Sequence, residues 1–246
     1  MLFMLLARLT LSPKRRQEGA WTRGRNIHMA RPPHFFDAVV EALYGGRAHS
    51  PYTSDDEPMP IDLSSYPHTH LPEDLVEQVL AAVQEEDAPL LAVELGSFVG
   101  GSAVRFARAL KRLGRDGQGA ALVCIDPFCG DANMWADHNG WRAWLQLRGG
   151  RPRLFEQFVA NVRSEAHDDM IVPLAATACV GCAVLRRLAA AGPGGAGAPA
   201  LPRPRLIYLD SAHEEGETLV EIQKAFALLA PCAPDLNSAA SAPPSA

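Results

Sequence analysis

The chain has 246 residues, of which 48% are hydrophobic, and carries a formal net charge of -5 with a pI near 5.9. This length can bury a sizeable core, and the acidic balance lacks the basic footprint of a nucleic-acid-binding protein. The five cysteines are spread over a long chain, unlike the dense framework of a small secreted protein. We therefore expect one domain that binds a small molecule.

The first 33 residues differ in composition from the rest, because basic residues face a single acid, Glu18. An arginine-rich, acid-poor leader is typical of an organelle transit peptide, and a non-native extension before Met29 would look the same. The apolar opening is interrupted by Arg8 and is too short to span a bilayer. We predict a basic leader over residues 1–33 and leave a cytoplasmic and an organellar location open.

An N-terminal helical segment is predicted over residues 34–89. Two amphipathic helices are expected at Phe35–Leu43 and Pro72–Glu85, separated by a stretch rich in proline and serine. Packing against a sheet is one role for this segment.

The core begins with a strand, a glycine loop and a helix at Leu91–Leu110, LAVELGSFVGGSAVRFARAL. An apolar run ends at Glu94, Gly96 and Gly100 permit a tight turn, and apolar residues at helical spacing follow. This pattern predicts a small-molecule cradle at the end of a parallel strand. Phe98 occupies the position where a dinucleotide fingerprint needs glycine, and a P-loop lysine is missing from the loop, so nucleotide phosphates are disfavoured.

A second strand ends in an acid at Ala121–Phe128, ALVCIDPF. Asp126 at its tip is placed to bind a ligand at the end of the strand, or it caps the turn before Pro127. The sequence leaves both interpretations open, and the spacing from Gly96 favours the first.

The connection Cys129–Arg151 is longer than a simple strand-to-helix loop and carries three tryptophans. Loops at the carboxyl ends of parallel strands make ligand sites, so Trp135, Trp141 and Trp144 could line a ligand pocket. The alternative, which we favour, is a small helix that buries its indoles.

Further elements complete an alternating α/β pattern. A helix is expected at Phe155–Val162, another around Val180–Leu188, and strands near residues 91–95, 121–125, 170–174 and 205–209. The pair Cys179 and Cys182 lacks a second pair at zinc-finger spacing and indicates buried thiols in an apolar helix. Gly192–Arg205 reads as a flexible linker.

A third motif, Leu206–Leu219 (LIYLDSAHEEGETL), places Asp210 at the end of the fourth strand. His213 follows three residues later. It could act as a base or orient a substrate, or it is a helix-start histidine satisfied by backbone and solvent.

Together these motifs resemble the class I S-adenosylmethionine-dependent methyltransferases, most closely the catechol-type and related small-molecule O-methyltransferases. VELGSFVGGSAVRFA follows the family's first motif position for position: an acid, any residue, glycine, three residues, glycine and a small-residue helix start. The resemblance implies a Rossmann-like, doubly wound parallel α/β sheet over residues 90–231 and O-methylation of a small-molecule acceptor. In the family, an N-terminal helical segment covers the cofactor or the acceptor.

The resemblance also implies roles for single residues. The glycines would let the backbone close on the methionine part of the cofactor, Glu94 would reach its ammonium group, Asp126 would bind the ribose, and the loop at residues 175–177 would lie near the adenine. Asp210 would face the acceptor and, as in the metal-dependent branch, hold Mg2+. The candidate cofactor-binding residues are Glu94, Gly96, Ser97, Gly100, Ser102, Asp126 and Ala176; the candidate catalytic residues are Asp210 and His213, with Asp210 also the candidate metal ligand.

The chain departs from the family after the helix that contains Leu219 and Leu229. In relatives a fifth strand, a metal-binding acid pair and two more strands follow, whereas here the sequence continues PCAPDLNSAASAPPSA, which has little to bury. We expect a fold truncated after the fourth strand and its helix, a disordered tail at 232–246, and an open edge on the fourth strand that invites self-association. The alternative function is a truncated, inactive product that binds cofactor or regulates a full-length relative.

Overall fold

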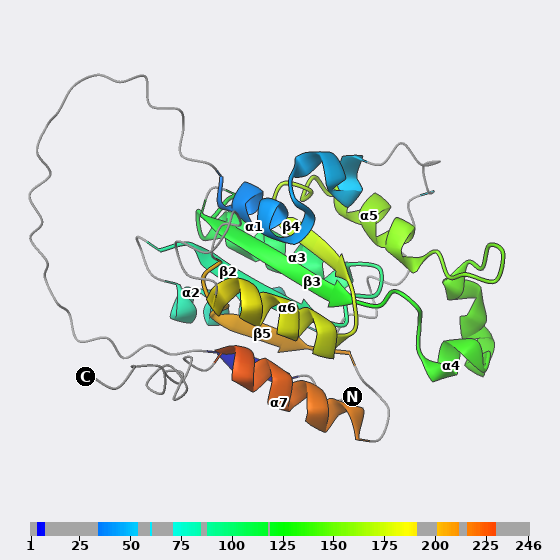
Figure 1. Ribbon diagram of the computed structural model, residues 1–246. Helices are drawn as coiled ribbons and strands as arrows, with labels where there is room; N and C mark the ends of the chain where they lie inside the picture. Colours follow the sequence, from blue (N-terminus) through cyan, green and yellow to red (C-terminus); the bar gives the residue numbers. More distant parts are fainter. Residues whose placement is uncertain are drawn as a thin grey trace, which may run out of the picture.

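The computed structural model describes residues 4–7, 34–53, 60, 71–84, 88–117, 119–190, 201–211 and 216–229. In these residues one five-stranded sheet has the order β1-β5-β2-β3-β4 (Figure 1). Strands β2 to β5 are parallel, and β1 pairs antiparallel with β5. The strands are β1 Met4–Ala7, β2 Leu90–Leu95, β3 Ala120–Asp126, β4 Ile171–Ala175 and β5 Leu206–Leu209.

Continuous apolar runs form the central strands because both faces of the sheet are covered by helices. Every residue of β2 is buried. Its side chains alternate between two core clusters, with Leu90 and Ala92 in one and Leu91, Val93 and Leu95 in the other. The predicted doubly wound parallel α/β fold is confirmed.

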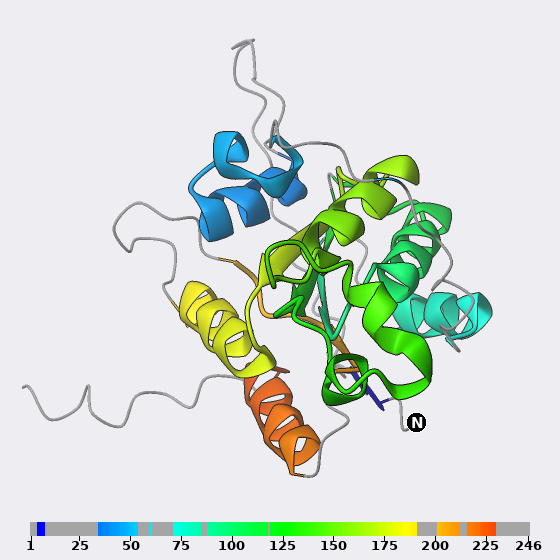
Figure 2. The same cartoon turned by 90° about the vertical axis from the view of Figure 1, so that its right-hand side faces the viewer.

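Helices lie on both faces of the sheet (Figure 2). α2 (Glu73–Val83), α3 (Gly101–Arg112) and α5 (Leu154–Ser164) contribute to the first core cluster. α1 (Phe35–Tyr44), α6 (Ala178–Ala190) and α7 (Glu217–Leu229) contribute to the second. The two predicted N-terminal helices thus pack on opposite faces. None of the helices in the described ranges is both long and apolar enough to cross a membrane.

Shorter helices fill two of the connections. The 3-10 helices η1 (Arg47–His49) and η2 (Pro51–Thr53) follow α1. α4 (Ala132–Trp135) and the 3-10 helix η4 (His138–Leu145) lie in the connection from β3 to α5, which extends beyond the carboxyl end of β3 (Figure 1).

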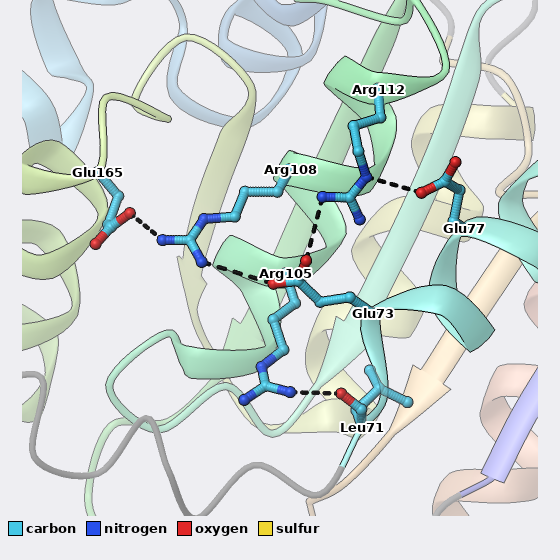
Figure 3. A network of polar contacts seen from close by, with 7 residues as sticks. All are labelled: Leu71, Glu73, Glu77, Arg105, Arg108, Arg112 and Glu165. Atoms are coloured by element: carbon cyan, nitrogen blue, oxygen red, sulfur yellow. Dashed lines mark hydrogen bonds and ion pairs between the residues drawn. The ribbon is translucent and has the colours of Figure 1, made fainter.

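Three arginines on one face of α3 fix it to its neighbours (Figure 3). The contacts join Arg112 to Glu77 at 2.7 Å and Glu73 at 3.1 Å, Arg105 to the Leu71 carbonyl at 2.7 Å, and Arg108 to Glu165 and, at 3.6 Å, to Glu73. Exposed pairs of this kind contribute only about 0.2–1 kcal/mol each. Their main effect is to orient α3, the helix that begins at the glycine loop, between α2 and the end of α5.

The expected open edge on β5 is wrong, and so is the expected flexible linker in its described part, residues 201–205. The edge of β5 is not open, because β1 pairs along it, with Met4 opposite Leu209 and Ala7 opposite Leu206. The unpaired N–H and C=O groups of an edge strand can bind another segment of the same chain, and here β1 is that segment. The end of the expected linker is packed, since Leu201 is buried and the Arg205 N–H donates to the Leu91 carbonyl at 2.9 Å. The rest of the leader, residues 192–200 of the expected linker and the tail at 232–246 lie outside the described residues.

The two cysteines of α6 differ in burial. Cys182 is buried, as expected, and burial raises its thiol pKa to about 12, whereas Cys179 is half-buried. Gly181 between them lets α6 approach the sheet, because a Cβ there would lie 2.5 Å from Cγ2 of Ile125. The motif therefore serves helix-to-sheet packing.

Candidate functional site

The glycine loop between β2 and α3 is closely packed against the protein itself. Gly96 has a φ of +83°, and a Cβ there would lie 2.4 Å from the carbonyl oxygen of Asp210 and 2.4 Å from Cα of Ser211. At Gly100, with φ +92°, a Cβ would lie 3.2 Å from the ring of Phe158. Both glycines thus allow close packing inside the fold, and their role toward a cofactor stays a prediction.

Glu94 is buried beneath this loop with incomplete hydrogen bonding. The side chain is 0% exposed, and its Oε1 accepts a hydrogen bond from the Ser102 hydroxyl. Neither Glu94 Oε2 nor Ser97 Oγ makes a well-aligned hydrogen bond in the described part of the chain. Burial raises the pKa of Glu94 to about 7, and the negative charge of Asp210 adds to the rise. Polar contacts of the carboxylate with Ser102, Ser97 and Cys124 lower the pKa and partly offset the rise.

Orphaned buried oxygens are uncommon and costly, so a polar ligand is one way to satisfy them. A group that carries several N–H donors and a positive charge suits Glu94 Oε2 and Ser97 Oγ, because it would supply hydrogen bonds and favour the charged carboxylate. These two atoms fit the amino group of the cofactor that the sequence motifs imply.

Asp126 at the end of β3 holds the glycine loop. Its Oδ2 accepts the N–H groups of Ser97 and Phe98, each at 2.9 Å, and its Oδ1 accepts the N–H of Phe128. Burial raises the pKa of Asp126, and the three N–H groups oppose that rise. The bond to Phe128 confirms the turn-capping interpretation, and binding of a ribose by the same carboxylate stays a prediction.

The third acid of the motifs follows β5. Asp210 is half-buried, and its Oδ2 accepts a hydrogen bond from the Tyr208 hydroxyl at 3.3 Å. The next residue, Ser211, donates from its hydroxyl to Glu221 of α7. His213 lies outside the described residues. In the part of the chain that the structure describes, histidine, cysteine and carboxylate side chains do not gather in threes as a metal site would require.

The structure brings most predicted site residues to one edge of the sheet. Glu94, Asp126 and Asp210 stand at or just past the carboxyl ends of β2, β3 and β5, which are neighbouring strands. Ala176, after β4, joins them through its N–H, which donates to the Asp126 carbonyl at 3.1 Å. In open α/β sheets, this edge is where ligands bind.

The tryptophans of the long connection are not buried in a small helix, so the expectation that we favoured is wrong. Trp135 is 43% exposed, and Trp141 and Trp144 are half-buried. The rings of Trp141 and Trp144 stack with their centroids 5.5 Å apart. The ring of Trp144 also packs, tilted, beside that of Phe98, with the two centroids 5.9 Å apart. The backbone bends through left-handed residues instead of forming one regular helix, so the indoles pair with each other and reach the glycine loop.

Sequence reasoning missed two residues of α5 near this site, Gln157 and Asn161. Both amides are buried, and Asn161 donates to the carbonyl of Val99 in the glycine loop at 3.0 Å. The available signal was two amides one helical turn apart beside Phe158 and Val162 on the apolar face.

Comparison with known proteins bears on the whole core. A family model described as a methyltransferase domain matches residues 93–233, which is more than half of the chain. No curated protein matches the chain as a relative. The match includes the glycine loop, Asp126 and Asp210, and the parallel sheet has the architecture that the resemblance implied. The chain belongs to the class I methyltransferase family.

Proposed function

We propose that this protein transfers a methyl group from S-adenosylmethionine to an oxygen atom of a small molecule. The family generally uses this cofactor. The observation that carries the proposal is the pair of buried oxygens, Glu94 Oε2 and Ser97 Oγ, which lack aligned partners in the described residues beside the glycine loop. An α-ammonium group at this position would donate to both.

The cofactor side of the proposal uses residues from three strand ends. Glu94, held by Ser102, would accept the ammonium group, and Asp126 would accept ribose hydroxyls. Ribose hydroxyls would share or replace the loop N–H donors of Asp126, so its carboxylate would join the loop to the ligand. Ala176, next to Asp126, would lie at the adenine. Bound there, the sulfonium supplies an already activated methyl group.

The acceptor side of the proposal centres on Asp210. Its carboxylate would accept a hydrogen bond from the acceptor hydroxyl and take up its proton, while the Tyr208 hydroxyl keeps Oδ2 oriented. Holding the acceptor oxygen in line with the methyl group contributes much of the rate, because the donor is already reactive. Trp141 and Trp144 would form a wall of the acceptor site beside Phe98.

A magnesium ion does not fit the described residues. Mg2+ is usually held by one or two carboxylates with waters and substrate oxygens, and it needs near-octahedral geometry. Asp210 is engaged by Tyr208, and further carboxylates do not gather around it among the described residues. We therefore assign no step of the proposed mechanism to a metal ion.

Calorimetric titration with S-adenosylhomocysteine tests the proposal. The wild-type protein should bind it, and Asp126→Ala should abolish binding. Asp131→Ala is the matched control, because Asp131 also accepts a backbone N–H after β3, from Met134 at 2.8 Å, but caps α4 instead of the glycine loop. Transfer of a radiolabelled methyl group to a panel of hydroxylated small molecules then tests oxygen as the target. A folded wild-type protein that does not bind S-adenosylhomocysteine would contradict the proposal.

A further inference from the structure

Two buried amides lie on α5, the helix that packs beneath the glycine loop. Gln157 is 1% exposed and Asn161 is 0% exposed, although their neighbours Phe158 and Val162 form apolar core. Burying an amide is unfavourable unless its donors and acceptor are all satisfied. An apolar residue of similar volume would fill the same space at no such cost.

The two amides form one chain of hydrogen bonds with a fixed direction. Asn161 Nδ2 donates to the carbonyl of Val99 at 3.0 Å, and Asn161 Oδ1 accepts from Gln157 Nε2 at 3.0 Å. Gln157 Oε1 in turn accepts from Gln146 Nε2 at 2.9 Å, and Gln157 Nε2 also donates to the carbonyl of Pro60 at 2.9 Å. Each amide donates through its nitrogen and accepts through its oxygen, which a carboxylate or an alkyl side chain cannot do, so this order of donors specifies one geometry.

The two ends of this chain lie in the two loops that border the proposed site. Val99 belongs to the glycine loop, directly after Phe98, whose N–H is held by Asp126. Gln146 directly follows η4, the 3-10 helix that carries the stacked tryptophans, and adopts a left-handed φ of +47°. A non-glycine residue in this region costs free energy, so a specific contact must hold Gln146 there.

We propose that Gln157 and Asn161 are positioning residues that fix the glycine loop and the tryptophan-bearing segment relative to each other. Through them, the strength of cofactor binding at the loop depends on the placement of Trp141 and Trp144, and displacement of either loop weakens the hold on the other. The packing of Phe98 on Trp144 is a second, direct link between the same loops. This inference rests on the proposed function, because the cofactor site at the glycine loop is itself a proposal.

The experiment uses the full chain with Trp21→Phe and Trp135→Phe, so that Trp141 and Trp144 are the only fluorescent indoles. Gln146→Leu interrupts the series of amide hydrogen bonds at its half-buried end, and Asn161→Leu interrupts it at the glycine loop. The control is Leu185→Ala, which truncates a buried side chain of α6 in the core cluster on the other face of the sheet. For each variant we would measure thermal unfolding, the tryptophan emission maximum with acrylamide quenching, and the affinity for S-adenosylhomocysteine.

We expect both leucine variants to shift the emission of the ligand-free protein and to weaken S-adenosylhomocysteine binding at least tenfold. Leu185→Ala should lower the melting temperature without changing emission or affinity. A variant Gln146→Leu that shifts emission but binds normally would overturn the inference, as would equal effects of Asn161→Leu and Leu185→Ala. If the wild type does not bind S-adenosylhomocysteine, the proposed function fails. The emission of ligand-free Asn161→Leu then decides the positioning role by itself, and an unchanged emission would overturn it.

Discussion

Gly96→Ala places a methyl group where the end of β5 meets the glycine loop. The new Cβ would lie 2.4 Å from the carbonyl oxygen of Asp210 and 2.4 Å from Cα of Ser211. Both obstructing atoms belong to the backbone, so no side chain can rotate away. The residue must also keep a φ of +83°, which L-amino acids disfavour.

The expected loss of stability is the sum of these two effects. The left-handed conformation costs about 1–2 kcal/mol for a residue with a Cβ. Overpacking against a fixed neighbour costs about 1–3 kcal/mol more. The free energy of unfolding should therefore fall by about 2–5 kcal/mol, which corresponds to a melting temperature roughly 4–20 °C lower for a chain of this size.

Gly114→Ala is the matched control for the conformational part. Gly114 also has a positive φ, +70°, but a Cβ there would meet no atom within 4 Å. The Gly114→Ala variant should therefore lose only the conformational part of the free energy of unfolding, about 1–2 kcal/mol. Chemical denaturation of both variants, read by circular dichroism, gives the difference. If Gly96→Ala is no less stable than Gly114→Ala, the close approach of β5 to the loop is not a real constraint.

Three further perturbations follow from the fold. Gly181→Ala should lose about 1–3 kcal/mol of stability by overpacking against Ile125, and adding Ile125→Ala should cost less than the sum of the single changes; strict additivity would argue against that contact. Because burial raises the pKa of Glu94 from 4.5 to about 7, the folded protein binds a proton at the Glu94 carboxylate more tightly than the unfolded chain does. The free energy of unfolding should therefore fall by up to about 3 kcal/mol as pH rises through that interval, and Glu94→Gln should flatten the fall in urea titrations at several pH values. Successive N–H groups of β1 alternate between facing β5 and facing away. Of the two variants Leu5→Pro and Leu6→Pro, only one should therefore remove a hydrogen bond to β5, uncover its edge and increase self-association measured by light scattering. Identical behaviour of the two variants would contradict the pairing.

Local patterns predicted the parallel core because each signal lies within one strand or helix. The apolar run ending at Glu94 and the one ending at Asp126 fix two strand ends, and parallel strands end at a common edge. The sequence therefore indicated that these acids lie close together. The hydrogen bonds of Asp126 to the glycine loop depend on loop conformation and were not predictable from its spacing.

What remained unpredicted depends on contacts between distant segments. β1 pairs with a strand near the other end of the sequence, and a four-residue apolar run carries no local sign of that partner. Gln157 and Asn161 are buried beside the apolar positions of α5, but helical spacing does not reveal that Asn161 donates to the distant carbonyl of Val99. Trp135 is exposed although its residue type is usually well buried.

The pairing of β1 with β5 also sets an order of events during synthesis. Residues Met4–Ala7 leave the ribosome about 200 residues before their partners Leu206–Leu209. At about 5–20 residues per second, the first strand waits roughly 10–40 s for its partner. The parallel pair β2 and β3 is synthesised well before that contact can form. The antiparallel pairing is thus a late event, which forms only after β2, β3 and β4 have all been synthesised and can already pair with one another.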